Sequence, residues 1–133
     1  MIVVDSNVIA YCWLNGSMTG LAQRVRVKDP DWRVPVLWRS EMRSILAGYL
    51  RDGSLSAAQT RSVMRQVEEA LAGFEHLVSS DAVLKVIEAS PLSAYDAEFV
   101  ALAEELSVSL VTEDKVVLKA FPQTALSMKA FLG

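Results

Sequence analysis

Short apolar runs that suit buried strands alternate in this chain with longer segments of helical periodicity. Strands are predicted at about 2–5, 33–37 and 107–112, with weaker candidates at 74–78 and 124–128. Helices are predicted at about 6–15, 19–28, 38–51, 56–73, 80–89, 93–106 and 114–120, followed by a short helical tail. Because parallel strands are joined by crossover helices, this alternation predicts an α/β fold with a central, mostly parallel sheet. We expect one domain spanning residues 1–133.

The composition excludes several kinds of site. His76 is the only histidine and Cys12 the only cysteine, so an internal disulfide and a zinc site built from cysteines are both excluded. No apolar run approaches the roughly 20 residues that span a bilayer, and the first residues lack the basic segment of a signal peptide. We therefore expect a cytoplasmic protein.

Charge is distributed unevenly along the chain. The net charge is −3, yet residues 1–66 hold nine of the 13 Lys and Arg, and residues 67–133 hold eleven of the 16 Asp and Glu. The negative total argues against nucleic-acid binding through overall charge. An arginine-rich surface from the first half could still follow a phosphate backbone, although the simpler explanation for each arginine is a solvated helix face.

Four acidic residues are predicted to meet at one edge of the sheet. Asp5 follows the first strand directly, and Asp114 follows the strand at 107–112 with one residue between. Glu41 and Asp96 each lie in the first turn of a helix that can begin at the same edge. Since parallel sheets bind ligands at the carboxyl ends of their strands, these four are candidate site residues.

Glu41 is the most informative of the four acids. It lies three residues after Trp38 and four before Ile45, on the apolar stripe of its helix. A carboxylate on a buried stripe costs on the order of several kcal/mol unless it is paired or coordinated. Two explanations remain open: Arg39 or Arg43 folds back to pair with Glu41, or Glu41 serves a functional site.

Helix capping is the alternative explanation for the other three acids. Asp5, or one of the two residues after it, can cap the helix that begins there. Ser93-Ala-Tyr-Asp96 has the pattern of a capping box with Asp in place of Glu. An acid such as Asp114 is favoured in any first helical turn. The functional interpretation therefore depends on all four acids meeting at one place.

Four carboxylates in one cleft repel each other, so some must bind protons or cations. Lys115, next to Asp114, offers one positive charge. Hard divalent cations match oxygen ligands better, and the lack of clustered histidine and cysteine favours Mg²⁺ or Mn²⁺ over zinc. Such ions polarise phosphate oxygens and activate water.

Four stretches of the sequence resemble successive motifs of PIN-domain proteins, in particular VapC-type toxins of prokaryotic toxin–antitoxin pairs. They are MIVVDSNVIAY, WRSEMRSIL, SPLSAYDAEFVALAEELSVSLVTEDKVVLKAFP and TALSMKAFL. The resemblance covers nearly the whole chain in order, and residues 91–122 are its most specific part. It implies a three-layer α/β/α PIN-like fold and a Mg²⁺-dependent endoribonuclease, with Mn²⁺ able to substitute.

The resemblance also assigns roles to individual residues. Carried over by position, Asp5, Glu41, Asp96 and Asp114 match the four acids of the family and become the catalytic and metal-binding candidates. Ser6 matches the small hydroxyl residue after the first acid, and we expect it to cap the helix and to hydrogen-bond that acid or its metal-bound water. Asn7 matches a frequent polar neighbour.

One position departs from the family pattern. Many members carry a further acid two or three residues after the fourth, where this chain has Val116 and Val117. Glu113 is adjacent to the fourth acid but is expected to point elsewhere. This departure weakens the case for a second metal ion more than for the first.

The predicted function is cleavage of RNA phosphodiesters by a metal-activated water, leaving a 5′-phosphate and a 3′-hydroxyl. Arg39 and Arg43 are candidates for contacts with RNA phosphates. A catalytically weak PIN-fold module that binds RNA or protein is the alternative, which a metal titration distinguishes. An aspartyl-phosphate phosphatase using Asp5 would need a second aspartate where this chain has Asn7.

Two partners are expected. The resemblance implies a cognate antitoxin, whose tail could fold into the groove of acids and place a basic side chain among them. The segment 54–73 has more apolar residues than one crossover helix must bury: Leu55, Val63, Met64, Val67 and Leu71. We therefore predict a homodimer with this helix or the preceding one near the two-fold interface. The alternative is that these side chains cover the chain's own core.

Overall fold

The computed structural model describes all residues 1–133 and contains one five-stranded sheet. Every neighbouring pair of strands is parallel, and the strand order is β3-β2-β1-β4-β5. The strands are β1 (Ile2–Val4), β2 (Trp32–Pro35), β3 (Glu75–His76), β4 (Leu110–Val111) and β5 (Ala125–Leu126). The predicted parallel sheet is confirmed, with shorter strands than the sequence pattern indicated.

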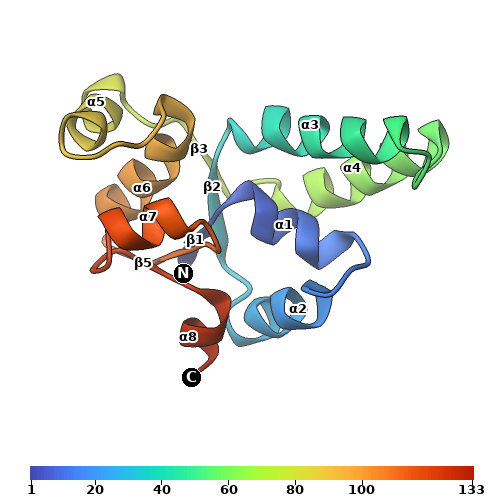
Figure 1. Cartoon of the computed structure of the whole chain (residues 1–133), viewed down its shortest axis with the longest axis horizontal. Coiled ribbons are helices and arrows are strands. Elements are labelled where there is room, and N and C mark those ends of the chain that lie inside the picture. The colour runs from blue at the N-terminus through green and yellow to red at the C-terminus, as the bar shows by residue number, and fades with distance from the viewer.

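Helices cover both faces of the sheet, so the three-layer α/β/α prediction is also confirmed (Figure 1). One layer contains α1 (Ser6–Trp13), α2 (Thr19–Lys28), α3 (Trp38–Arg51) and α4 (Ala57–Leu71). The opposite layer contains α5 (Ser80–Glu88), α6 (Ala94–Leu106) and α7 (Lys115–Ala120). The last helix, α8 (Met128–Leu132), packs beside α2.

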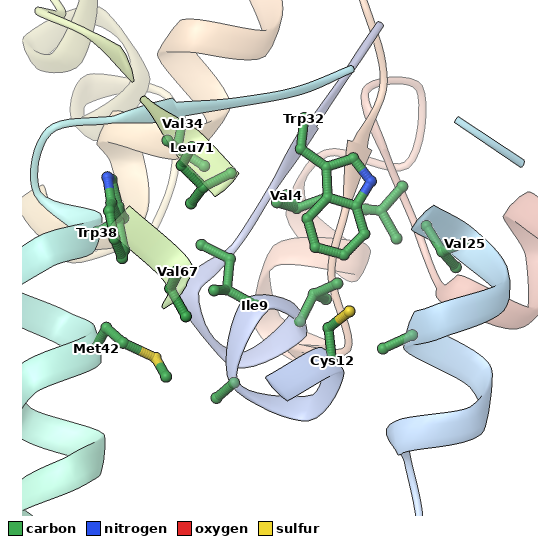
Figure 2. Close-up of a cluster of buried hydrophobic side chains, with 14 of the residues drawn as sticks. Val4, Ile9, Cys12, Val25, Trp32, Val34, Trp38, Met42, Val67 and Leu71 are labelled. Atoms are coloured by element: carbon green, nitrogen blue, oxygen red, sulfur yellow. The ribbon is translucent and has the colours of Figure 1, made fainter. Parts of the chain in front are cut away.

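The apolar run of β1 explains the two layers. Ile2 and Val4 belong to the larger core cluster, whereas Val3 belongs to the smaller one on the other face. All three are buried, as expected for a central parallel strand. In the larger cluster, Figure 2 shows Trp32 of β2 and Ile9 of α1 among the side chains that fill the space between the sheet and its helices.

The order of the strands places a topological switch point beside β1. The chain runs from β1 outward through β2 to β3, then crosses back to β4 on the other side of β1 and continues to β5. In open α/β sheets, the crevice at the carboxyl ends of the two strands that flank such a point is the usual ligand site. Here those strands are β1 and β4, which are followed by Asp5 and Asp114.

The apolar side chains expected to be in surplus on the segment 54–73 pack mainly on the chain's own core, which weakens this premise of the predicted dimer. Val67 and Leu71 are buried in the larger core, and Leu55, Val63 and Met64 pack against it. The helix α4 begins at a complete capping box, in which Ser56 and Gln59 each bond the other's backbone N–H. These apolar side chains stabilise the chain's own fold, which was the alternative explanation.

No helix of the chain is both long enough and apolar enough to cross a membrane.

Candidate active site

Asp5 and Asp114 both lie at the switch point, and both cap helices. The Oδ1 atom of Asp5 accepts a hydrogen bond of 3.0 Å from the backbone N–H of Val8 in α1. The Oδ1 atom of Asp114 accepts bonds from the N–H groups of Val116 and Val117 in α7. The capping explanation is therefore correct for these two acids, and capping fixes each carboxylate at the end of its strand.

Thr112 joins the two aspartates and was not among the predicted site residues. Its side chain is fully buried. The Thr112 hydroxyl donates to Oδ2 of Asp5 and accepts a bond of 3.0 Å from the N–H of Asp114. A threonine at the end of a buried strand, two residues before a predicted site acid, is the signal that could have identified it. Thr112 thus fixes the position of the Asp5 carboxylate relative to the backbone of Asp114 at the switch point.

Glu41 is held by Ser6 and not by an arginine. The Ser6 hydroxyl donates a bond of 2.8 Å to Oε1 of Glu41, and no ion pair involves Glu41. Ser6 is buried in the first turn of α1. Ser6 neither caps α1 nor bonds Asp5, because Asp5 itself is the cap and the Ser6 hydroxyl donates to Glu41 of α3. Burying a polar hydroxyl requires such a partner. A bond from Ser6 to a metal-bound water stays a prediction.

Asp96 lies in the first turn of α6, and its carboxylate takes no part in a complete capping box. The Ser93 hydroxyl accepts a bond of 3.1 Å from the Asp96 N–H. The return bond, from the Ser93 N–H to the Asp96 carboxylate, is not formed, unlike the equivalent bond at Ser56. The cap at this helix is therefore Ser93, which leaves the Asp96 carboxylate available to the site.

All four acids line one cavity of about 240 Å³, as predicted. Its polar wall also includes Ser44, a further residue not predicted, which lies one turn after Glu41 on α3. The complete lining is Asp5, Ser6, Asn7, Glu41, Ser44, Ile45, Asp96, Phe99, Leu110, Thr112, Asp114 and Val117. Glu113 lies outside this lining, as expected, and its Oε2 atom accepts from the N–H of Met128.

Burial and mutual repulsion raise the pKa values of three of these carboxyl groups. Burial raises the pKa of Asp5 to about 6, with further contributions from the charges of Asp114 and Glu41. Burial also raises the pKa of Glu41, and Asp96 adds to the effect. The pKa of Asp96 rises through burial and the charge of Asp114. The four acids are thus close enough for their negative charges to affect one another's pKa values.

None of the chain's own cations neutralises this cluster. The five ion pairs of the chain involve none of the four acids, and Lys115 is exposed. A cluster of carboxylate oxygens without His or Cys is the donor set that Mg²⁺ and Mn²⁺ prefer. As they stand, no three acidic, histidine or cysteine side chains converge closely enough to form a ready-made metal site. The donor chemistry fits Mg²⁺, and the side chains would have to turn toward a shared ion.

Comparison with solved structures identifies the fold. PAE2754 from Pyrobaculum aerophilum has a TM-score of 0.75 and 21% sequence identity, over 98% of this chain and 92% of that one. FitAcB from Neisseria gonorrhoeae has a TM-score of 0.74 and 16% identity, over 97% and 99%. The chain has a PIN-like fold. A toxin–antitoxin complex from Klebsiella pneumoniae is also similar, with a TM-score of 0.69 and 15% identity over 96% and 98%. No protein-family model and no curated protein sequence matches the chain.

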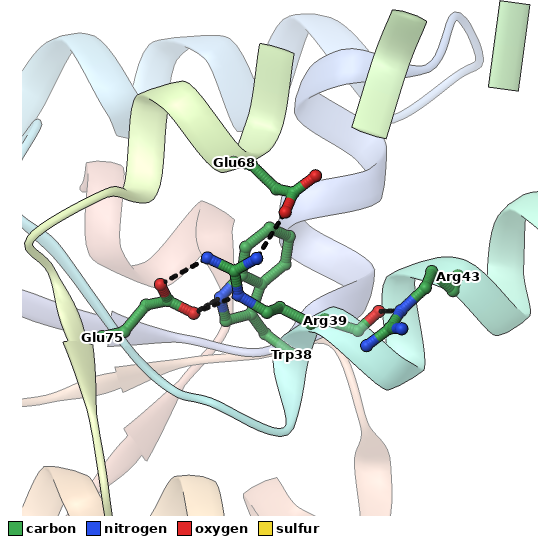
Figure 3. A network of polar contacts seen from close by, with 5 residues as sticks. All are labelled: Trp38, Arg39, Arg43, Glu68 and Glu75. Carbon is green, nitrogen blue, oxygen red and sulfur yellow. Dashed lines mark hydrogen bonds and ion pairs between the residues drawn. The ribbon is translucent and has the colours of Figure 1, made fainter. Parts of the chain in front are cut away.

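In this PIN-like fold, Arg39 is engaged by other residues of the chain (Figure 3). Its Nε and Nη2 atoms donate to the two carboxylate oxygens of Glu75 at 2.7 and 2.8 Å, and Nη1 pairs with Glu68. Trp38 donates from Nε1 to the same Glu75 carboxylate at 2.8 Å. Arg43 is exposed and donates only to the backbone carbonyl of Arg39. Neither arginine lines the cavity, and Arg43 has no carboxylate partner.

We expect replacement of Arg39 by Met to lower the free energy of unfolding by about 1–2 kcal/mol, because it breaks a forked ion pair that ties α3 to α4 and β3. Arg43→Met is the matched control and should change that free energy by less than about 0.5 kcal/mol. Urea denaturation of both variants measures the difference. Weaker RNA binding by Arg39→Met with unchanged stability would instead indicate a phosphate contact.

Proposed function

We propose that this chain is a Mg²⁺-dependent endoribonuclease and the toxin of a type II toxin–antitoxin pair acting in the cytoplasm. The observation that carries the proposal is the cavity lined by Asp5, Glu41, Asp96 and Asp114, none of which is neutralised by a lysine or arginine. The PIN-like fold supports it, as does the similarity to a complex described as toxin and antitoxin.

In this proposal the four acids hold the metal ion, and the residues around them keep those acids in place. A divalent ion held there supplies a Lewis acid for phosphate oxygens and activates water for attack on phosphorus. Thr112 and the Val8 N–H orient the Asp5 carboxylate, and Ser6 orients Glu41. Hydrolysis breaks the bond between phosphorus and the 3′ oxygen, which takes a proton and leaves as a hydroxyl. The phosphate stays on the 5′ oxygen of the following nucleotide.

The number of ions follows from the acids available. Val117 lines the cavity and Val116 is 53% exposed, at the positions where a further acid would extend the donor set. With only four carboxylates, we propose that one ion is held tightly and that a second, if it binds, is held mainly by the RNA phosphate.

RNA cleavage is expected to require Mg²⁺ or Mn²⁺ and to stop in EDTA. Unstructured RNA incubated with the purified chain should be cut into products with 5′-phosphate ends, and excess Mg²⁺ should restore cleavage after chelation. Gel electrophoresis and end-labelling measure both outcomes. Cleavage at the same rate in chelator, by protein freed of contaminating nucleases, would refute the proposal.

A module that binds RNA or protein without cleaving it remains the alternative function. It differs from the main proposal in one measurable way: calorimetry would detect RNA binding without any binding of Mg²⁺ to the free chain. An enzyme whose acids hold the ion should bind Mg²⁺ in the absence of RNA, and the binding should weaken below about pH 6, where Asp5 takes up a proton.

Two protein partners belong to the proposal. An antitoxin segment that carries a basic side chain would complement the acidic cavity. A homodimer is also proposed, although most apolar side chains of α4 pack on the chain's own core. The groove between α3 and α4 remains available, with the partly exposed Leu50 and the cations Arg43 and Arg61 along it. Light scattering of the chain alone tests the dimer, since a monomer mass at micromolar concentration would remove it.

A further inference from the structure

A second hollow lies beside the acidic cavity, between α1 and α3. It has a volume of about 220 Å³ and includes Tyr11 of α1 and Tyr49 of α3. Asn7 and Ile45 line both this hollow and the cavity of acids, so the two spaces are adjacent. The part of a ligand next to a group held at the acids therefore lies close to the hollow.

The lining of this hollow differs in charge from that of the cavity beside it. No Asp, Glu, Lys or Arg contributes to it, whereas four carboxylates line the neighbouring cavity. Its polar residues are neutral, among them Asn7 and Asn15. An amide offers both donors and an acceptor. The hollow thus suits a neutral group that carries hydrogen-bonding atoms, and it is unsuited to a phosphate.

The two tyrosines narrow the choice of ligand further. Tyr11 and Tyr49 are only partly buried and pack against the larger core, so part of each side chain remains accessible. Burial, followed by the negative charges of Asp5 and Glu113, raises the pKa of Tyr11, so its hydroxyl is uncharged at neutral pH. A volume of about 220 Å³ is below the roughly 300–1,000 Å³ typical of whole small-molecule sites. It suits a single flat ring system.

We infer that the hollow between α1 and α3 is a nucleobase subsite, in which one unpaired base of the RNA stacks on Tyr11 or Tyr49 while an adjacent phosphate lies at the acids. Single-stranded RNA is commonly recognised by stacking on aromatic side chains, with amides reading the base edges. The assignment rests on the proposed ribonuclease function and deepens it, because it explains how the chain would select unpaired RNA and hold it in register.

The test measures base stacking separately from cleavage. The reporter is 2-aminopurine, whose fluorescence falls on stacking, placed at each position in turn of a short unstructured RNA. Binding is measured in Mg²⁺ with Asp96→Asn protein, and electrophoresis checks that the RNA stays intact. We expect one position to be quenched, Tyr49→Leu to abolish that quenching and to weaken binding about tenfold, and Tyr49→Phe to bind within about twofold of the parent.

A coupling experiment then identifies what fills the hollow. Removing the base at the quenched position should also weaken binding about tenfold, and Tyr49→Leu combined with the abasic RNA should be no weaker than either change alone. Tyr11→Leu, on the other helix, should show the same coupling. Thermal unfolding of the leucine variants checks that they fold.

Several outcomes overturn the subsite. If Tyr49→Leu combined with the abasic RNA weakened binding about a hundredfold, the two effects would be independent. That result would exclude contact between the base and the tyrosine. An equal loss in Tyr95→Leu, a tyrosine that is 63% exposed and lines neither space, would indicate a non-specific effect. Unchanged RNA binding by Tyr49→Leu with weakened binding of a protein partner would assign the hollow to a protein side chain. Coupling without any RNA cleavage by wild-type protein would keep the subsite and refute the nuclease, so the two failures are distinguishable.

Discussion

Asp96→Asn is expected to lower the rate of Mg²⁺-dependent RNA cleavage by at least about a hundredfold while changing the free energy of unfolding by less than about 1 kcal/mol. The loss of rate follows from removing one anionic oxygen ligand from a set of only four acids. Stability is retained because Asn keeps the backbone N–H that bonds Ser93, and the Asp96 carboxylate has no return bond to lose. Single-turnover cleavage and urea denaturation of the same preparation measure both effects.

Ser93→Ala is the matched control for this prediction, because it removes the cap of the same helix and leaves the acid in place. It should lower the free energy of unfolding by about 1 kcal/mol and keep cleavage within a few-fold of wild type. If Asp96→Asn cleaved RNA at the wild-type rate, Asp96 would be only a first-turn helix residue, and the proposed metal-binding set would be wrong.

The fold could be predicted because its strongest signals are local. Apolar runs such as Ile2–Val4, capping residues such as Ser56, and the spacing of strands and helices each depend on neighbouring residues. The prediction was poorest for β4, expected at 107–112 and found at Leu110–Val111. Ser107 adopts a left-handed conformation, with φ of 55°, as the C-cap of α6. The chain therefore becomes extended later than the apolar pattern suggests.

The meeting of the four acids was also predictable, since the carboxyl ends of parallel strands must share one edge. The partners of those acids were not. Thr112 and Asp5 are 107 residues apart in the sequence, Ser6 and Glu41 are 35 apart, and Arg39 and Glu75 are 36 apart. Local pattern does not determine such long-range pairs. For this reason Ser6 was assigned to the wrong acid, and Arg39 was considered for RNA when its guanidinium is already paired.

Replacing Asp5 by Asn is expected to raise the stability of the metal-free chain at pH 7, by about 3 kcal/mol. Burial raises the pKa of Asp5 from 3.8 to about 6 in the folded chain, and a difference of about two pKa units corresponds to about 3 kcal/mol. Asn is nearly the same shape and can still accept from the Val8 N–H. The Thr112 hydroxyl, which now donates to Asp5, can rotate to accept from the new amide.

The dependence on pH gives the sign of this effect. Below about pH 4, Asp5 is largely protonated in both the folded and the unfolded chain. The folded chain then has the full stability that goes with a neutral Asp5 carboxyl. As pH rises through 6, the unfolded chain has already lost the proton and the folded chain loses it at a cost. The wild-type chain should therefore lose stability relative to Asp5→Asn between about pH 4 and pH 6, and the difference should be constant above that range.

Urea denaturation in EDTA across this pH range measures the difference, and the raised pKa values of Glu41 and Asp96 remain in both proteins. A difference that does not vary with pH would show that the Asp5 carboxyl ionises normally in the folded chain. Adding Mg²⁺ at pH 7 should then stabilise the wild type but not Asp5→Asn, because only a ligand that prefers the folded state raises its stability. These two results together would show that the charge of Asp5 destabilises the metal-free fold and that a bound cation restores the lost stability. They would connect the aspartate at the end of β1 directly to the metal-dependent activity proposed for it.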